Sequence, residues 1–187
     1  MAIQVANPRA QNSALKDEIA AAVQQVFDSG IFILGPNVSA LEAEVPVVCE
    51  AKYGIAVNSG TDALVVALAA AGVGPGDEVI TTPFTFVATT EAIVIVGAKP
   101  VYADIDPNNF NLDPAKVREK ITNKTRAILP VHLYGQCADV EEFEAIAREH
   151  NLKIVFDGAQ AIGSKSNGKG IGVYGDASTL SFYPTKN

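Results

Sequence analysis

The sequence predicts an α/β fold in which a mostly parallel β-sheet is sandwiched between helices. Short runs of β-branched and other apolar residues alternate with segments of helical periodicity along most of the 187 residues. Such alternation is typical of sheets whose strands are joined by crossover helices. The composition is that of an ordinary globular protein, with 48% hydrophobic and 19% charged residues. This length and composition suggest one domain.

In the first 71 residues the pattern predicts three helices and one strand. The helices are expected at residues 15–29, 38–50 and 62–71, and the strand at 55–57. The first helix has an apolar face, formed by Ile19, Val23, Val26 and Phe27, and it closes at Gly30. Pro46 is expected to break or kink the second helix, because proline lacks the backbone N–H that an interior turn needs.

From residue 72 onward strands and helices alternate strictly. Strands are expected at residues 78–81, 100–104, 127–131, 153–156 and 177–182, and helices at 86–96, 114–121 and 140–150. Asp113 followed by Pro114 is typical of a helix N-terminus. Asp139, with Glu142 three residues later, resembles a capping box.

The charge and the cysteines exclude several classes of function. A net charge of −7 argues against a nucleic-acid partner, which would require a basic face. No apolar run reaches the ~20 residues of a membrane span, and the N-terminus lacks the pattern of a signal peptide. Cys49 and Cys137 fit no metal-ligand spacing, so we expect no metal site and two reduced, buried thiols in a cytoplasmic protein.

The predicted fold also indicates where a ligand binds. In open α/β sheets ligands lie at the carboxyl ends of the strands. Four loops leave predicted strands there, and we expect them to converge on one site. They are Ser59-Gly60-Thr61, the segment 82–86, the turn that begins at Asp157, and the segment 181–186.

Each of the four loops has a functional interpretation and a structural alternative. Ser59-Gly60-Thr61 suits a phosphate, since the first N–H groups of a helix attract anions and Gly60 permits close approach; alternatively Ser59 only caps the helix with Asp62. Asp157 ends an apolar strand and needs a partner, such as a protonated ring nitrogen, an arginine or a following helix that it caps.

The other two loops carry a lysine and two aromatic residues. Lys186 is either an ordinary surface residue or an amine nucleophile in an enclosed site, with the Ser181 hydroxyl beside the same phosphate. Phe84 and Phe86 are either core residues or a platform for a planar ring. Together the four loops fit one ligand with a phosphate, a pyridine nitrogen, an aldehyde and a flat face. Pyridoxal 5′-phosphate (PLP) has these four features.

The chain also resembles a known family along nearly its whole length. The segments that carry the resemblance are Asn58-Ser59-Gly60-Thr61-Asp62, Gly74-Pro75-Gly76-Asp77-Glu78, Phe84-Thr85-Phe86, Val131-His132-Leu133-Tyr134-Gly135-Gln136, Asp157-Gly158-Ala159-Gln160 and Ser181-Phe182-Tyr183-Pro184-Thr185-Lys186-Asn187. They are similar to the DegT/DnrJ/EryC sugar aminotransferases. The resemblance implies the fold type I of PLP-dependent transferases, the large domain of aspartate aminotransferase.

The resemblance implies roles for particular residues. Lys186 would hold PLP covalently and move protons, Asp157 would keep the pyridine nitrogen protonated, and Gln160 would hydrogen-bond the ring's 3-oxygen. Phe86 would stack on the ring while Phe84 belongs to the core. The phosphate would be held by Gly60, Thr61 and Ser181.

The reaction implied is transfer of an amino group, with glutamate as the usual donor, through PLP to a keto group on a nucleotide-linked sugar. Such sugars serve surface polysaccharide and related amino-sugar biosynthesis. Alternatives are a PLP-dependent sugar dehydratase or lyase, against which Lys186 argues, and a non-catalytic regulatory or binding protein on the same fold. A nucleotide-binding domain without PLP is disfavoured because the glycine fingerprint is absent.

The resemblance also bears on domains and assembly. Family members are about twice as long, so residues 1–187 are expected to be the N-terminal part of the PLP-binding large domain, with a C-terminal small domain outside this chain. We expect a homodimer for the longer protein, and we expect these residues alone to be inactive.

Overall fold

The fold is a parallel sheet between two helical layers, as the sequence predicts. The computed structural model describes residues 7–186. Five parallel strands pair in the order β2-β1-β3-β4-β7. Their bounds are β1 Glu78–Thr81, β2 Lys99–Tyr102, β3 Thr125–Ile128, β4 Lys153–Asp157 and β7 Ala177–Thr179. A small antiparallel hairpin, β5 Lys165–Ser166 with β6 Lys169–Gly170, stands apart from the sheet.

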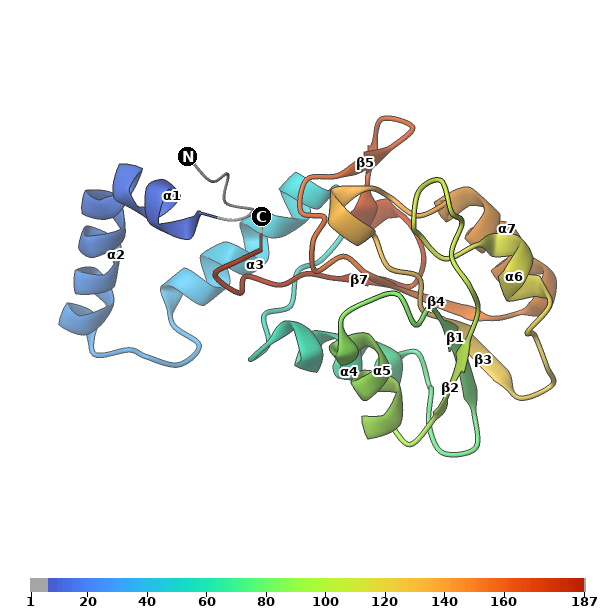
Figure 1. The fold of residues 1–187 in the computed structure, drawn as a ribbon. Helices are drawn as coiled ribbons and strands as arrows, with labels where there is room; N and C mark the ends of the chain where they lie inside the picture. The colour runs from blue at the N-terminus through green and yellow to red at the C-terminus, as the bar shows by residue number, and fades with distance from the viewer. Residues whose placement is uncertain (1–6, 187) are drawn as a thin grey trace.

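The helices surround the sheet and extend beyond it (Figure 1). They are α1 Pro8–Ala14, α2 Lys16–Ser29, α3 Pro36–Cys49, α4 Gly60–Ala70, α5 Val87–Ile95, α6 Pro114–Arg118 and α7 Val140–His150, with 3₁₀ turns η1 Leu133–Gly135 and η2 Ile171–Val173. The predicted caps form: the side chains of Asp113 and Asp139 accept hydrogen bonds from the N–H groups of Ala115 and Glu142.

Two hydrophobic clusters lie on opposite faces of the sheet. Successive residues of a strand point to opposite faces, so Val79 and Ile80 belong to different clusters. The cluster that contains Val79 packs under α4 and α5, with Leu68 and Ile93. The cluster that contains Ile80 packs under α6 and α7, and it includes the fully buried Phe143. Each strand is therefore fixed in register, because a slip by one residue would exchange the two faces.

Several predicted elements have other bounds in the structure; the predicted strand 177–182, for example, ends at Thr179. Two predictions are contradicted outright. Residues 55–57 are not a strand, because no strand among residues 7–186 pairs with them and the N–H of Ala56 donates to the Glu42 side chain at 2.8 Å instead. Helix α3 continues past Pro46, so of the two predicted outcomes, a break or a kink, the break is wrong. Gly54 lies against this turn: a Cβ there would be 2.6 Å from the Glu42 carbonyl oxygen and 3.0 Å from the proline ring.

The N-terminal arm, which we define as α1 and α2, projects away from the sheet (Figure 1). The arm contains no buried residue, although α2 has the apolar face that its sequence predicts. Within residues 7–186 no helix is long and apolar enough to cross a membrane.

Candidate active site

The site is built around Asp157, the last residue of β4. Its side chain is 5% exposed and accepts hydrogen bonds from the Thr89 hydroxyl at 2.7 Å and the Ala159 N–H at 3.1 Å. Burial raises the pKa of the Asp157 carboxyl, while the two hydrogen bonds and the charge of Lys186 act in the opposite direction. No helix follows Asp157 for it to cap, since residues 158–164 form turns. A buried carboxylate in this setting is suited to a cationic partner.

Two threonines orient the carboxylate. Thr89 on α5 uses its hydroxyl proton for Asp157, so the 2.9 Å bond between Thr85 and Thr89 must have Thr85 as donor. The result is a directed chain from Thr85 through Thr89 to Asp157. Because every donor in it points toward the carboxylate, the chain favours the ionised form of Asp157.

Gly60 and Ser181 lie against each other at the N-terminus of α4. A Cβ at position 60 would be 3.0 Å from the Cβ and 3.2 Å from the hydroxyl oxygen of Ser181. Ser59 caps the helix, because its hydroxyl oxygen accepts the N–H of Asp62 at 3.0 Å. The capping interpretation of Ser59 is therefore confirmed. The neighbouring Gly60, Thr61 and Ser181 place a hydroxyl beside the first turn of a helix, an arrangement that suits an anion.

Lys186 and Phe86 approach each other from different loops. The Lys186 Nζ lies 5.9 Å from the centroid of the Phe86 ring, which precedes α5. Phe86 is 66% exposed, so its ring is not part of the core. Phe84 is 44% exposed and packs beside Phe110, with ring centroids 6.0 Å apart. The expectation that Phe84 belongs to the core is therefore wrong: the short loop after β1 directs its ring into a surface hollow instead.

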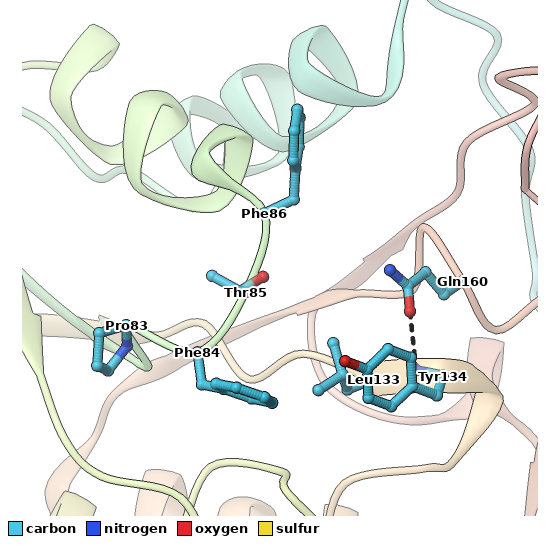
Figure 2. Close-up of a pocket in the computed structure, with 7 residues that line it drawn as sticks. All are labelled: Pro83, Phe84, Thr85, Phe86, Leu133, Tyr134 and Gln160. Atoms are coloured by element: carbon cyan, nitrogen blue, oxygen red, sulfur yellow. Dashed lines mark hydrogen bonds between the residues drawn. The ribbon is translucent and has the colours of Figure 1, made fainter. Parts of the chain in front are cut away.

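Gln160 lies on the opposite side of that hollow. Its Oε1 accepts the backbone N–H of Tyr134 at 2.8 Å. Because Oε1 is held this way, the other end of the amide is the NH₂ donor. Figure 2 shows the nitrogen turned toward the side of Thr85 and Phe86. The hollow has a volume of about 200 Å³ and is lined by Pro83, Phe84, Thr85, Phe86, Leu133, Tyr134 and Gln160.

The site also depends on residues that the sequence did not single out. Thr89 reaches Asp157 across 68 positions of the chain. His132 is fully buried, its ring stacks on Phe156 with centroids 4.8 Å apart, and its Nδ1 accepts the N–H of Ala138 at 3.0 Å. Burial lowers the pKa of His132 to about 4, so the ring is neutral at neutral pH and its proton is on Nε2.

Residues 13–187 match the model of the DegT/DnrJ/EryC1/StrS aminotransferase family. The chain belongs to this family. It is 55% identical over 177 residues to the pleiotropic regulatory protein of Geobacillus stearothermophilus, covering 95% of this chain and 48% of the relative. It is 46% identical over 186 residues to the UDP-N-acetyl-3-dehydro-alpha-D-glucosamine 3-aminotransferase of Acidithiobacillus ferrooxidans, covering 100% and 50%. The chain thus spans about half the length of the curated relatives it matches.

Two solved structures share this fold. DesV of S. venezuelae, in complex with a ketimine intermediate, superposes with a TM-score of 0.92 at 43% identity, covering 96% of this chain and 48% of that one. NtdA of Bacillus subtilis, with bound cofactor PMP, superposes with a TM-score of 0.86 at 40% identity, covering 91% and 38%.

Proposed function

We propose that the protein is a PLP-dependent aminotransferase that passes an amino group, with glutamate as donor, to a keto group on a nucleotide-linked sugar. The observation that carries the proposal is Asp157, a buried carboxylate at a strand end that forms no salt bridge with any residue of the described part of the chain. The protonated pyridine nitrogen of PLP would provide its missing cationic partner. The names of several relatives, which include UDP- and dTDP-sugar transaminases, support the substrate class.

The described residues fit this cofactor at each of its polar ends. Asp157 would bind and keep the proton on the ring nitrogen, with its own ionised form favoured by Thr89. The NH₂ group of Gln160 would donate to the ring's 3-oxygen, which suits the donor orientation fixed by Tyr134. Thr61 and the adjacent pair Gly60 and Ser181 would hold the phosphate.

Two residues would face the ring itself. Phe86 would cover one face of the ring, which its exposure permits. The amine of Lys186, 5.9 Å from the centre of that phenyl ring, would hold the cofactor and move protons to and from the substrate carbon. Bound PLP supplies an electron sink for the carbanion that forms when a proton leaves that carbon.

The proposal extends to domains, assembly and location. Residues 1–187 would form the N-terminal part of the PLP-binding large domain, with a small domain formed by further sequence, in keeping with the twofold length of the relatives. The protein would act in the cytoplasm as a homodimer. Support for the dimer comes from the N-terminal arm, where Ile19, Val23 and Phe27 are 44%, 49% and 64% exposed on one face.

A half-reaction tests the proposed activity. Full-length protein loaded with PLP and mixed with glutamate should form 2-oxoglutarate and lose its visible absorbance band, and the Lys186→Ala variant should do neither. A sugar dehydratase would instead release water from the sugar without consuming the amino group. Absence of 2-oxoglutarate with glutamate and with other amino acids would contradict the proposal.

A regulatory protein on the same fold is the second candidate function. The observation that favours it is the 55% identity to a relative named as a pleiotropic regulatory protein. Its test uses the same protein without added substrate. A regulator that does not use PLP would show no visible absorbance from PLP bound to Lys186. An aminotransferase would bind one equivalent of PLP per chain there.

A further inference from the structure

The segment 132–138, which we name the η1 loop, is held by hydrogen bonds at nearly every residue. The buried side chain of Asn111 makes three hydrogen bonds to it: Oδ1 accepts the N–H of Leu133 at 3.0 Å, and Nδ2 donates to the carbonyl oxygens of Gln136 and Cys137, each at 3.2 Å. Asn111 is 2% exposed. Its amide has both the acceptor and the two donors that this loop requires, a combination that only Asn or Gln offers.

Two further side chains hold the same loop. His132 Nδ1 accepts the N–H of Ala138 at 3.0 Å, and the Ser164 hydroxyl donates to the Gly135 carbonyl oxygen at 2.7 Å. The loop is thus tied from three directions, by Asn111, by its own first residue and by Ser164.

These hydrogen bonds maintain an unusual backbone conformation at Tyr134. This residue has φ 55° and ψ 26°, in the left-handed region that residues with a Cβ rarely adopt. Its side chain is 73% exposed, so packing of the tyrosine ring does not account for the conformation. Strained backbone persists where surrounding contacts over-determine it, and it is concentrated at functional sites.

The strained residue provides one contact to the candidate site through its backbone. The N–H of Tyr134 donates to Gln160 Oε1 at 2.8 Å, as Figure 2 shows, and this bond decides which end of the Gln160 amide is the donor. If the loop relaxed, the amide could rotate and present oxygen in place of NH₂ to a ligand in the site.

We propose that Asn111 is a positioning residue for Gln160, acting through the η1 loop so that the amide NH₂ faces the 3-oxygen of the cofactor. The inference rests on the proposed function, because it concerns how PLP is held. The side chain of Asn111 bonds the loop backbone at Leu133, and its effect on Gln160 runs through the backbone of Leu133 and Tyr134.

The experiment is a double-mutant cycle in the full-length protein, with the dissociation constant of PLP and the position of its visible band as readouts. Asn111→Ala should weaken PLP binding by about 5-fold, the worth of one ordinary hydrogen bond, and shift the band in the same direction as Gln160→Ala. In the Gln160→Ala background, Asn111→Ala should change PLP binding by less than about 2-fold, because the contact it positions is already gone.

Ser164→Ala is a milder change, because it removes only one partly buried hydrogen bond to the loop. It should weaken PLP binding by about 2-fold. Ser178→Ala is its matched control, because Ser178 is also partly buried and donates to a backbone carbonyl oxygen, that of Ile171 at 3.0 Å. This control should leave the dissociation constant and the band unchanged.

The possible failures are distinguishable. Equal effects of Asn111→Ala in both backgrounds, or equal effects of Ser164→Ala and Ser178→Ala, would overturn the inference and leave the proposed function standing. If Asn111→Ala does not fold, the two serine variants decide the matter. Failure of the unsubstituted protein to bind PLP would overturn the proposed function and this inference with it.

Discussion

The N-terminal arm and the sheet with its helices use similar apolar residues in different surroundings. Phe143 on α7 is fully buried, whereas Phe27 on α2 is 64% exposed. In α7 the apolar face packs on strands that the same chain provides; in the arm no residue is buried. An amphipathic pattern therefore predicts that the apolar face of a helix will be buried, but it does not predict which element or partner will bury it. The sheet region should be stable through its own contacts, and the arm through contacts that residues 7–186 do not supply.

The largest expected effect comes from making the same change in both regions. Phe143→Ala should lower the free energy of unfolding by about 3–5 kcal/mol, because it leaves a cavity in the cluster beneath α7. Phe27→Ala should change it by less than about 0.5 kcal/mol in the monomer, since the ring is mostly in water already.

Urea unfolding monitored by circular dichroism measures both values, and sedimentation velocity separates the monomer from any dimer. The Phe27→Ala variant should shift the protein toward the monomer. Equal losses of stability in the two monomeric variants would mean that the arm is not the separate region described above.

Protonation of His132 should lower the free energy of unfolding of the sheet region by an amount similar to that expected for Phe143→Ala. The unfolded chain has the ordinary pKa of 6.5, and burial lowers the folded value to about 4. Above the unfolded pKa neither state is protonated, so the group contributes nothing there. As the pH falls from 6.5 to about 4, the unfolded chain binds a proton that the folded protein excludes, and the free energy of unfolding falls by up to roughly 3 kcal/mol.

His132→Asn is the comparison for this prediction, because its Oδ1 takes the place of Nδ1 and can still accept the Ala138 N–H, and it does not titrate. Stability curves of the two proteins, measured between about pH 7 and about pH 4.5, should diverge as the pH falls. Parallel curves would mean that His132 is protonated as readily in the folded protein as in the unfolded chain.

The junction between α3 and the small hairpin should have an intermediate sensitivity. A Cβ at Gly170 would lie directly against the carbonyl oxygen of Cys49, at the end of α3. Gly170→Ala should therefore cost about 2 kcal/mol of unfolding free energy. Gly74→Ala is the matched control, since a Cβ there meets no atom within 4 Å, and it should be neutral within about 0.5 kcal/mol. Thermal unfolding of both variants tests whether α3 is packed as firmly as the sheet.

Asp157→Asn should have a smaller effect on stability than Gly170→Ala, and one of opposite sign. Burial raises the pKa of Asp157, so the folded protein holds its ionised form at neutral pH at a cost. Above the ordinary pKa of 3.8 the folded state binds the proton more tightly than the unfolded chain, and stability falls as the pH rises through the raised pKa. Removing the charge should stabilise the cofactor-free protein by about 1 kcal/mol while weakening PLP binding. A loss of stability would mean that the carboxylate is a structural requirement.

The parts of the fold that could be predicted from the sequence depend on local signals. The bounds of β1 and the caps at Asp113 and Asp139 follow from residues adjacent in the chain. The error at residues 55–57 has the opposite cause. An apolar β-branched run favours an extended backbone, but a strand also needs a paired neighbour, and here the Glu42 side chain takes the N–H of Ala56.

The same distinction applies to the site. Asp157 and Lys186 could be proposed as site residues because Asp157 ends β4 and Lys186 lies in the segment after β7, and strand ends converge in parallel sheets. Thr89 and Asn111 gave no such signal, since a threonine within a helix and an asparagine in a loop are common. Their significance arises from contacts 68 and 22 positions away in sequence, which only the folded chain brings together.

The most direct test of the central claim is to find which residue carries the cofactor. Full-length protein incubated with PLP would be reduced with borohydride, digested and mapped by mass spectrometry, with Lys186→Ala as the control. We expect one pyridoxyl group per chain, on the peptide that contains Lys186, and none in the variant. A label on another lysine, or no label on the folded protein, would contradict it.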